Sequence, residues 1–184
     1  VDLVRTRSGQ ALPSSLYAVQ ASGTAVPHAP LTQDIACRIA IVGAGFTGLS
    51  TALHLARRGI PSVVLEANEP GWGASGRNGG QVNPGMKHAP EEVARDIGAA
   101  AVAFSHAAPD RVSNLVQDYQ IDCDFRRGGT IRAATDAQSM RELEGLARQS
   151  AAHGIDVRML SAEVMAAEVG TTRYLGGLID ARGG

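Results

Sequence analysis

The pattern of apolar and polar positions divides the chain into three regions. Residues 1–34 contain three prolines and many serines and alanines without a sustained hydrophobic period, which predicts an extended N-terminal arm. The pattern changes at Arg38, because residues 39–42 form a continuous apolar run that is typical of a strand buried on both faces. We expect the second region to cover residues 35–120 and the third to cover residues 121–184.

A strand, a helix and a second strand follow one another within residues 39–65. The helix is indicated by four apolar positions that share one face, Leu49, Ala52, Leu53 and Ala56. Gly59 follows as a helix stop, and residues 61–65 predict a second buried strand. This order predicts a βαβ unit with a right-handed crossover, and therefore an α/β protein.

Helices and strands also alternate in the rest of the chain. Helical spacing resumes over residues 91–120, where Pro109 must kink or split the helix because it removes a backbone donor. Residues 123–134 are strand-like, with a bulge expected at Gly128-Gly129. The last elements are a helix with a capping box at Thr135 and Gln138 that ends at Gly154, a strand over 157–160, a helix capped by Ser161 and a strand over 174–180.

The strongest chemical signal is GAGFTG at residues 43–48, directly after the first strand and at the start of the helix. In a dinucleotide-binding turn, Gly43 allows the tight turn, Gly45 lets the backbone approach a pyrophosphate, and Gly48 permits close packing of helix on strand. The helix N-terminus offers unpaired N–H groups to the phosphates. The alternative, a glycine-rich turn in an ordinary βαβ unit, leaves the next residue of interest unexplained.

That residue is Glu66, which ends the second strand 18 positions after Gly48, the last glycine of the turn. A carboxylate there accepts hydrogen bonds from the adenosine ribose hydroxyls and repels a 2′-phosphate, which disfavours NADP. We therefore predict a Rossmann-like dinucleotide-binding unit. It is incomplete, because only two of its strands are recognisable before residue 91.

A second glycine-rich segment, GWGASGRNGGQ at residues 71–81, lies in a loop over residues 70–90 that has no periodicity. Together with residues 43–66, it resembles the FAD-dependent amine and amino-acid oxidoreductases, the superfamily of D-amino-acid oxidase, glycine oxidase and sarcosine oxidase. It most resembles the gamma-glutamylputrescine oxidoreductase branch, as do IDCDF at 121–125 and DARGG at 180–184. The resemblance extends from about Ser15 to the end of the chain.

The resemblance implies that this loop runs past the pyrophosphate of FAD toward the flavin ring. Small residues leave backbone amides free to face the cofactor, and Ser75 offers a hydroxyl. Arg77 offsets phosphate charge or is a solvated loop cation, and Trp72 packs over the cofactor or fills a gap. The candidate cofactor-binding residues are Gly43, Gly45, Phe46, Thr47, Gly48, Glu66, Ala67, Trp72, Ala74, Ser75, Arg77, Asn78, Gly79, Gly80 and Gln81.

The attachment and chemistry of the flavin also follow from the resemblance. Relatives that attach flavin covalently through this loop use a histidine, whereas residues 70–81 contain neither His nor Cys, so we expect non-covalent FAD. The implied reaction is oxidation of a C–N bond in a small-molecule amine or amino acid by hydride transfer to the flavin, with a gamma-glutamylputrescine-like substrate. The flavin carries the difficult step, so no catalytic side chain is assigned.

Two other functions stay open at this point. The first is a flavin dehydrogenase that passes electrons to a quinone or another carrier, and the second is a non-catalytic nucleotide-binding fragment that needs a second polypeptide. The remaining strands of the Rossmann-like unit, a second glycine-rich segment and most of a substrate-domain sheet are not recognisable. We therefore expect the first part of an FAD-binding domain at 35–120 and the first, truncated part of an α+β substrate domain at 121–184. This chain would then be a fragment of the enzyme, or one product of a split or nicked chain whose C-terminal half is a separate polypeptide.

Composition excludes several classes of partner and location. There are 17 basic and 18 acidic residues, and this balance argues against a nucleic-acid partner. The longest apolar stretch is about eight residues, short of the ~20 needed for a membrane span, and no secretory signal is visible, so we expect a cytoplasmic protein. Cys37 and Cys123 lack metal-ligand spacing; we predict buried thiols and no metal site.

Overall fold

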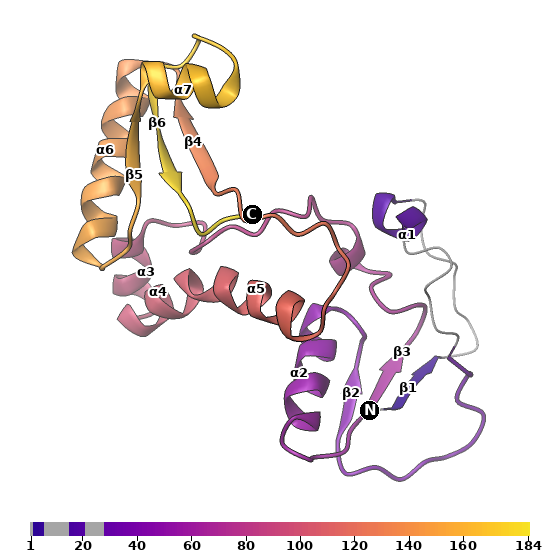
Figure 1. Ribbon diagram of the computed structural model, residues 1–184. Coiled ribbons are helices and arrows are strands. Elements are labelled where there is room, and N and C mark those ends of the chain that lie inside the picture. The colour runs from indigo at the N-terminus through magenta and orange to yellow at the C-terminus, as the bar shows by residue number, and fades with distance from the viewer. Residues whose placement is uncertain (1, 6–14, 21–27) are drawn as a thin grey trace. The chain divides into compact units, whose positions relative to one another are not determined.

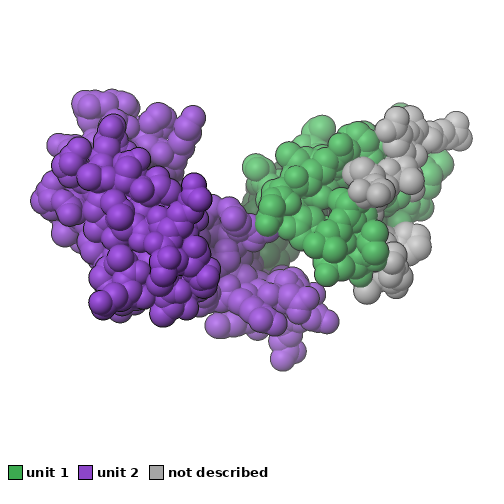
Figure 2. Space-filling model, turned by 90° about the horizontal axis from the view of Figure 1, so that it is seen from above, with its two compact units in different colours: residues 1–79 green, residues 80–184 purple. Residues whose placement is uncertain are grey.

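The computed structural model describes residues 2–5, 15–20 and 28–184 of the chain (Figure 1). The chain divides into two compact units, residues 1–79 and 80–184 (Figure 2). Each unit has its own three-stranded sheet.

The first unit contains the predicted βαβ arrangement. Strand β2 (Ala40–Val42) leads into helix α2 (Phe46–Ala56) and then into strand β3 (Val63–Glu66). The two strands are parallel, with Ala40 opposite Val63. The structure thus confirms the α/β βαβ unit that the apolar pattern predicts.

The N-terminal region also contributes to this sheet. Strand β1 (Asp2–Arg5) pairs in parallel with the other edge of β3, which gives the order β1-β3-β2. Helix α1 (Leu16–Gln20) lies in the same region. The extended arm predicted for residues 1–34 therefore includes a strand and a short helix, while residues 6–14 and 21–27 lie outside the described part of the chain.

The core of the first unit is small and lies between the sheet and α2. Ala44, Ala52 and Val64 are almost completely buried, and Ile41 packs against them. The expectation that the first strand is buried on both faces is wrong, because the side chain of Val42 is 86% exposed. Among the described residues β2 pairs only with β3, and α2 covers only one face of the strands.

The second unit begins with three consecutive helices in place of one long helix. They are α3 (Pro90–Asp96), α4 (Ala99–His106) and α5 (Ala108–Asp118). Pro109 lies in the first turn of α5, which confirms the predicted split at this residue. A second break falls at Gly98, whose φ of +117° is incompatible with a continuing helix.

An antiparallel sheet completes the second unit, in the order β4-β6-β5. The strands are β4 (Thr130–Ala134), β5 (Arg158–Ser161) and β6 (Gly176–Asp180). Helices α6 (Ala137–Ala152) and α7 (Ala162–Val169) contact the sheet. Leu143 and Leu178 form part of the core, and the fully buried Met165 packs toward Gly177.

Two local predictions in this region differ from the structure. The strand expected from residue 123 begins only at Thr130, because Asp124 has a φ of +52° that interrupts extended backbone. Helix α6 is capped by Asp136, whose carboxylate accepts a hydrogen bond from the Ser139 N–H at 2.7 Å, and not by Thr135. By contrast, the predicted Ser161 cap is confirmed.

The two cysteines are exposed, so the prediction of buried thiols is wrong. Cys37 precedes β2 and Cys123 lies between α5 and β4, and both residues lie outside the helices and strands. Within the described part of the chain, no helix has both the length and the apolar character needed to cross a bilayer.

Candidate dinucleotide-binding site

The glycine-rich turn after β2 has the geometry that its sequence predicts. Gly43 adopts a φ of +96°, and its N–H donates to the carbonyl of Leu65 at 2.7 Å. A Cβ atom on Gly48 would lie only 1.9 Å from the Gly43 carbonyl oxygen. Positions 43 and 48 therefore both require glycine, the first for the backbone angle and the second for close packing of α2 on the turn.

Glu66 is held in place at the end of β3 by two backbone amides. Its Oε2 accepts a hydrogen bond from the Ala44 N–H at 2.7 Å, and its Oε1 accepts one from the Asn68 N–H at 2.9 Å. Each carboxylate oxygen has further lone pairs, so the group can still accept hydrogen bonds from ligand hydroxyls. The carboxylate is half-buried and joins the end of β3 to the glycine-rich turn.

The second glycine-rich segment, residues 71–81, begins against the same turn; we call it the flavin loop. The Gly71 N–H donates to the Ala44 carbonyl at 2.9 Å. The hydroxyl oxygen of Ser75 accepts a hydrogen bond from the backbone N–H of Phe46, the first residue of α2, at 2.9 Å. The Asn78 side-chain amide donates to the Ser75 carbonyl at 2.8 Å. The loop is thus attached to the start of the helix.

Arg77 and Trp72 interact with each other inside the flavin loop. The guanidinium carbon lies 4.3 Å from the centre of the Trp72 ring, and the Arg77 Nε–H donates to the Trp72 carbonyl at 3.0 Å. Arg77 is otherwise exposed. The sequence placed both residues in the loop, but only the structure shows that the cation stacks on the ring.

The other candidate residues differ in exposure and in the unit to which they belong. Thr47, Ala67 and Ala74 are exposed at the rim of the turn, the β3 end and the loop. Gly79 ends the first unit, whereas Gly80 and Gln81 begin the second, and each unit is described by itself.

Four further residues that build this site were not predicted from the sequence. Ala44, Asn68 and Gly71 act through backbone groups, as described above. Gly76 is required because a Cβ atom there would lie 2.3 Å from the Gly71 carbonyl oxygen. A backbone contact does not depend on the type of residue, so the sequence does not reveal it. Only the glycine at position 76 could have indicated a tight turn.

The arrangement suits a phosphate-containing ligand. The first amides of α2 have no partner within the helix, and Gly45 at the helix start provides no side-chain cap. The Glu66 carboxylate is bonded to Ala44, just before the helix, and the Ser75 hydroxyl is bonded to Phe46, its first residue. No group of His, Cys, Asp and Glu side chains in the described ranges is arranged to hold a metal ion.

Comparison with known families is consistent with this geometry. Residues 38–184 match the model of a family described as DAO, FAD dependent oxidoreductase. The chain belongs to this family. The resemblance seen in the sequence is therefore confirmed, and FAD is the cofactor that membership indicates.

Individual relatives agree with the family assignment. The chain is 37% identical over 176 residues to gamma-glutamylputrescine oxidoreductase of Escherichia coli, covering 93% of this chain and 41% of that protein. It is 30% identical over 161 residues to "Probable oxidoreductase OrdL" of Haemophilus influenzae, covering 84% of this chain and 37% of that protein. The chain thus spans about two fifths of the length of these relatives.

Solved structures share the fold. L-proline dehydrogenase from P. horikoshii matches with a TM-score of 0.68 at 15% identity, covering 83% of this chain and 38% of that one. Glycine oxidase from Bacillus cereus matches with a TM-score of 0.61 at 21% identity, covering 81% of this chain and 39% of that one.

The residues of the first unit fit the adenosine diphosphate half of FAD. The turn has no room for a side chain at position 48, where a Cβ atom would collide with the Gly43 carbonyl oxygen, so α2 starts close to the Gly43 backbone. Glu66 presents a carboxylate that is suited to ribose hydroxyls, and the positive N-terminal end of α2 suits the pyrophosphate.

Proposed function

We propose that this chain provides the FAD-binding part of an oxidoreductase that oxidises a C–N bond in a small-molecule amine or amino acid. One observation carries the proposal: the start of α2, the Glu66 carboxylate and the Ser75 hydroxyl meet at one glycine-rich turn. A gamma-glutamylputrescine-like substrate is proposed from the relative that is 37% identical.

The protein's own groups would bind and orient the cofactor. The N–H groups at the start of α2 would bind the pyrophosphate, and Glu66 would accept hydrogen bonds from the ribose hydroxyls. Ser75 and the amides of the flavin loop would hold the cofactor on its other side. When bound, the flavin would supply the hydride acceptor for oxidation of the carbon next to the substrate nitrogen, and no side chain of this chain is assigned a proton-transfer role.

The binding is proposed to be non-covalent, because residues 70–81 contain neither His nor Cys. We also propose that turnover requires more of the enzyme than this chain contains, since it spans about two fifths of its relatives. A cytoplasmic location remains a proposal as well.

The test is a titration of the full chain with FAD, with FMN as the matched control. FMN lacks the second phosphate and the adenosine ribose, so we expect FAD to bind at least tenfold more tightly, as followed by flavin fluorescence. Acid precipitation of the complex should leave the flavin in the supernatant. Equal affinity for FMN would contradict the assigned roles of Glu66 and α2, and flavin in the pellet would contradict non-covalent binding.

The substrate is tested on a polypeptide that spans the full length of the relatives. Addition of gamma-glutamylputrescine under anaerobic conditions should bleach the flavin, and small amino acids serve as comparison substrates. Subsequent oxygen consumption with peroxide release would indicate an oxidase, whereas reduction of a quinone without oxygen consumption would indicate a dehydrogenase.

A further inference from the structure

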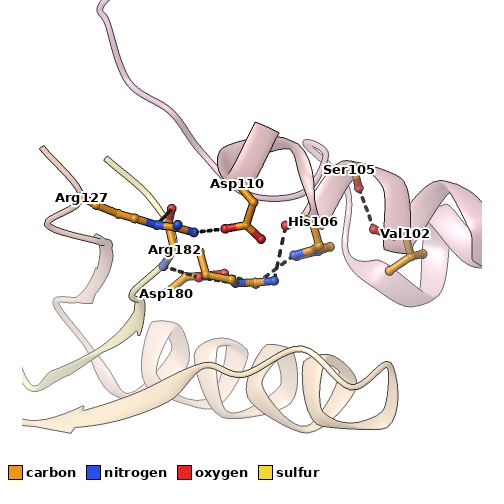
Figure 3. Close-up of polar contacts among 7 residues, drawn as sticks. All are labelled: Val102, Ser105, His106, Asp110, Arg127, Asp180 and Arg182. Carbon is orange, nitrogen blue, oxygen red and sulfur yellow. Dashed lines mark hydrogen bonds and ion pairs between the residues drawn. The ribbon is translucent and has the colours of Figure 1, made fainter. Parts of the chain in front are cut away.

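The second unit contains a polar cluster that the proposed function does not use. Arg182 follows strand β6, and its guanidinium makes two hydrogen bonds to the carboxylate of Asp180, from Nε to Oδ1 at 2.9 Å and from Nη2 to Oδ2 at 2.6 Å (Figure 3). The side chains are only 26% and 13% exposed, respectively. A charge-assisted pair of this kind, shielded from solvent, is stronger than an exposed ion pair.

The same guanidinium reaches the end of helix α4. Nη2 of Arg182 donates to Nδ1 of His106 at 3.1 Å, and Nη1 donates to the His106 carbonyl at 3.4 Å. A guanidinium has no acceptor, so Nδ1 must be the unprotonated ring nitrogen, and the imidazole is neutral in this contact. Arg182 therefore joins the end of β6 to α4.

The main chain of Arg182 is held from a third direction. Its carbonyl accepts a hydrogen bond from Nε of Arg127 at 3.2 Å, and Arg127 also pairs with Asp110 of helix α5 (Figure 3). Both the side chain and the main chain of Arg182 are therefore fixed.

Gly183 and Gly184, which follow Arg182, connect it through backbone hydrogen bonds to the residue after the flavin loop. The Gly129 N–H donates to the Gly183 carbonyl at 2.9 Å. Gly184 and Val82 exchange two backbone hydrogen bonds, at 2.7 Å and 3.0 Å. Val82 directly follows Gln81, the last residue of the flavin loop.

Close packing explains why these two positions are glycines. A Cβ atom on Gly183 would lie 2.7 Å from the Thr130 side chain, and one on Gly184 would lie 2.5 Å from the Arg126 carbonyl oxygen. The segment 182–184 thus lies against residues 126–130 and also pairs with Val82. Any displacement of this segment would break the hydrogen bonds between Gly184 and Val82.

We propose that Arg182 is a positioning residue that anchors the C-terminal end of the flavin loop. By holding residues 182–184 against α4, it fixes Val82 and with it the preceding Gly80 and Gln81. The consequence for FAD rests on the proposed function, whereas the anchoring of Val82 does not.

The test compares Arg182→Gln with the control Arg173→Gln, an exposed arginine elsewhere in the same unit. In the full chain without FAD, we expect amide hydrogen exchange at Val82 to become about tenfold faster in Arg182→Gln, because charged hydrogen bonds are lost. Exchange at Leu160 in β5 should stay unchanged, and Arg173→Gln should match the wild type. With FAD added, the Kd of Arg182→Gln should rise about threefold or more.

The outcomes separate the proposal from the proposed function. Unchanged exchange at Val82, an equal increase at Val82 and Leu160, or an unchanged Kd would each overturn the positioning role. If the wild-type chain binds no FAD, the proposed function fails while the exchange at Val82 still tests the anchor. Should Arg182→Gln not fold, Arg182→Lys keeps the charge beside Asp180 but loses the planar set of donors, and a smaller increase at Val82, without one at Leu160, is expected.

Discussion

The hydroxyl oxygen of Ser75 lies 2.9 Å from the backbone nitrogen of Phe46, and this hydrogen bond joins the flavin loop to the first residue of α2. The amide concerned belongs to the helix N-terminus, where anions bind in dinucleotide folds. Ser75 therefore stands at the edge of the proposed pyrophosphate position. The loop and the helix are expected to contact the same ligand group.

Replacement of Ser75 by alanine should weaken FAD binding. The variant loses the hydrogen bond that holds the loop on α2, worth about 0.5–1.5 kcal/mol, so FAD must order the loop at that cost and the Kd should rise about two- to tenfold. Flavin fluorescence titration of the full chain measures the change. Ser50→Ala, at an exposed position on α2, is the control and should keep the wild-type Kd; a wild-type Kd in Ser75→Ala would contradict the role given to the hydroxyl.

Gly48→Ala should disrupt the turn itself. The new methyl group would lie 1.9 Å from the Gly43 carbonyl oxygen, so the helix or the turn must move, at a cost of about 1–3 kcal/mol in the free energy of unfolding. Urea denaturation and FAD titration should both report the loss. Gly73→Ala is a matched control, because a Cβ atom there meets nothing within 4 Å. Equal stability of the two variants would show that α2 does not pack on the turn in this way.

Glu66→Ala should lower both stability and FAD affinity. Removal of the carboxylate leaves the buried amide of Ala44 without its acceptor, which costs about 1–3 kcal/mol. Glu66→Gln keeps one acceptor oxygen and should lose less. Urea denaturation and FAD titration compare these variants with Glu144→Gln, at an exposed position on α6, which should behave as wild type. If Glu66→Gln and Glu66→Ala lost equal stability, the Ala44 contact would not be the cause.

The stability of the second unit should fall as the pH is lowered through the range in which histidine titrates. Burial, and then the adjacent Arg182, hold the pKa of His106 below its usual value of 6.5; His153 acts in the same direction and Asp180 opposes it. The unfolded chain therefore binds the proton more readily than the folded chain. The stability from neutral His106 is complete above about pH 6.5 and decreases as the pH falls toward the lowered pKa.

Urea denaturation at pH 7.5 and 5.5 measures this effect. Asp110 and Arg127 lie beside the same cluster and pair with each other. His106→Gln has no titrating group at this position and should lose less stability on acidification than the wild type. An identical loss in both proteins would assign the pH dependence to other groups.

Much of the architecture could be predicted from residue pattern, because each of these signals is local. The apolar run before GAGFTG and the helical spacing after it predict the β2-α2-β3 unit. Pro109 predicts the split between helices, and Ser161 predicts the start of α7. Neighbouring residues alone impose these constraints.

Features that depend on distant partners were not predictable in the same way. Asp2–Arg5 forms a strand only because the edge of β3 is available to pair with it, and Val42 is exposed because of its place in the sheet. Cys37 and Cys123 are exposed, and nothing in the sequence around either residue indicates this exposure.

By itself, the sequence determined the membership in a flavin-dependent family and the positions that must be small or acidic, such as Gly48 and Glu66. These positions are set by backbone geometry and by the chemistry of a phosphate and a ribose, which act within one βαβ unit. Only the tertiary structure decided that Ser75 caps the start of α2 and that Arg182 holds the segment paired with Val82. Those contacts join residues far apart in the chain, and hydrogen-bond partners at such separations are chosen by the fold and not by the spacing of residue types.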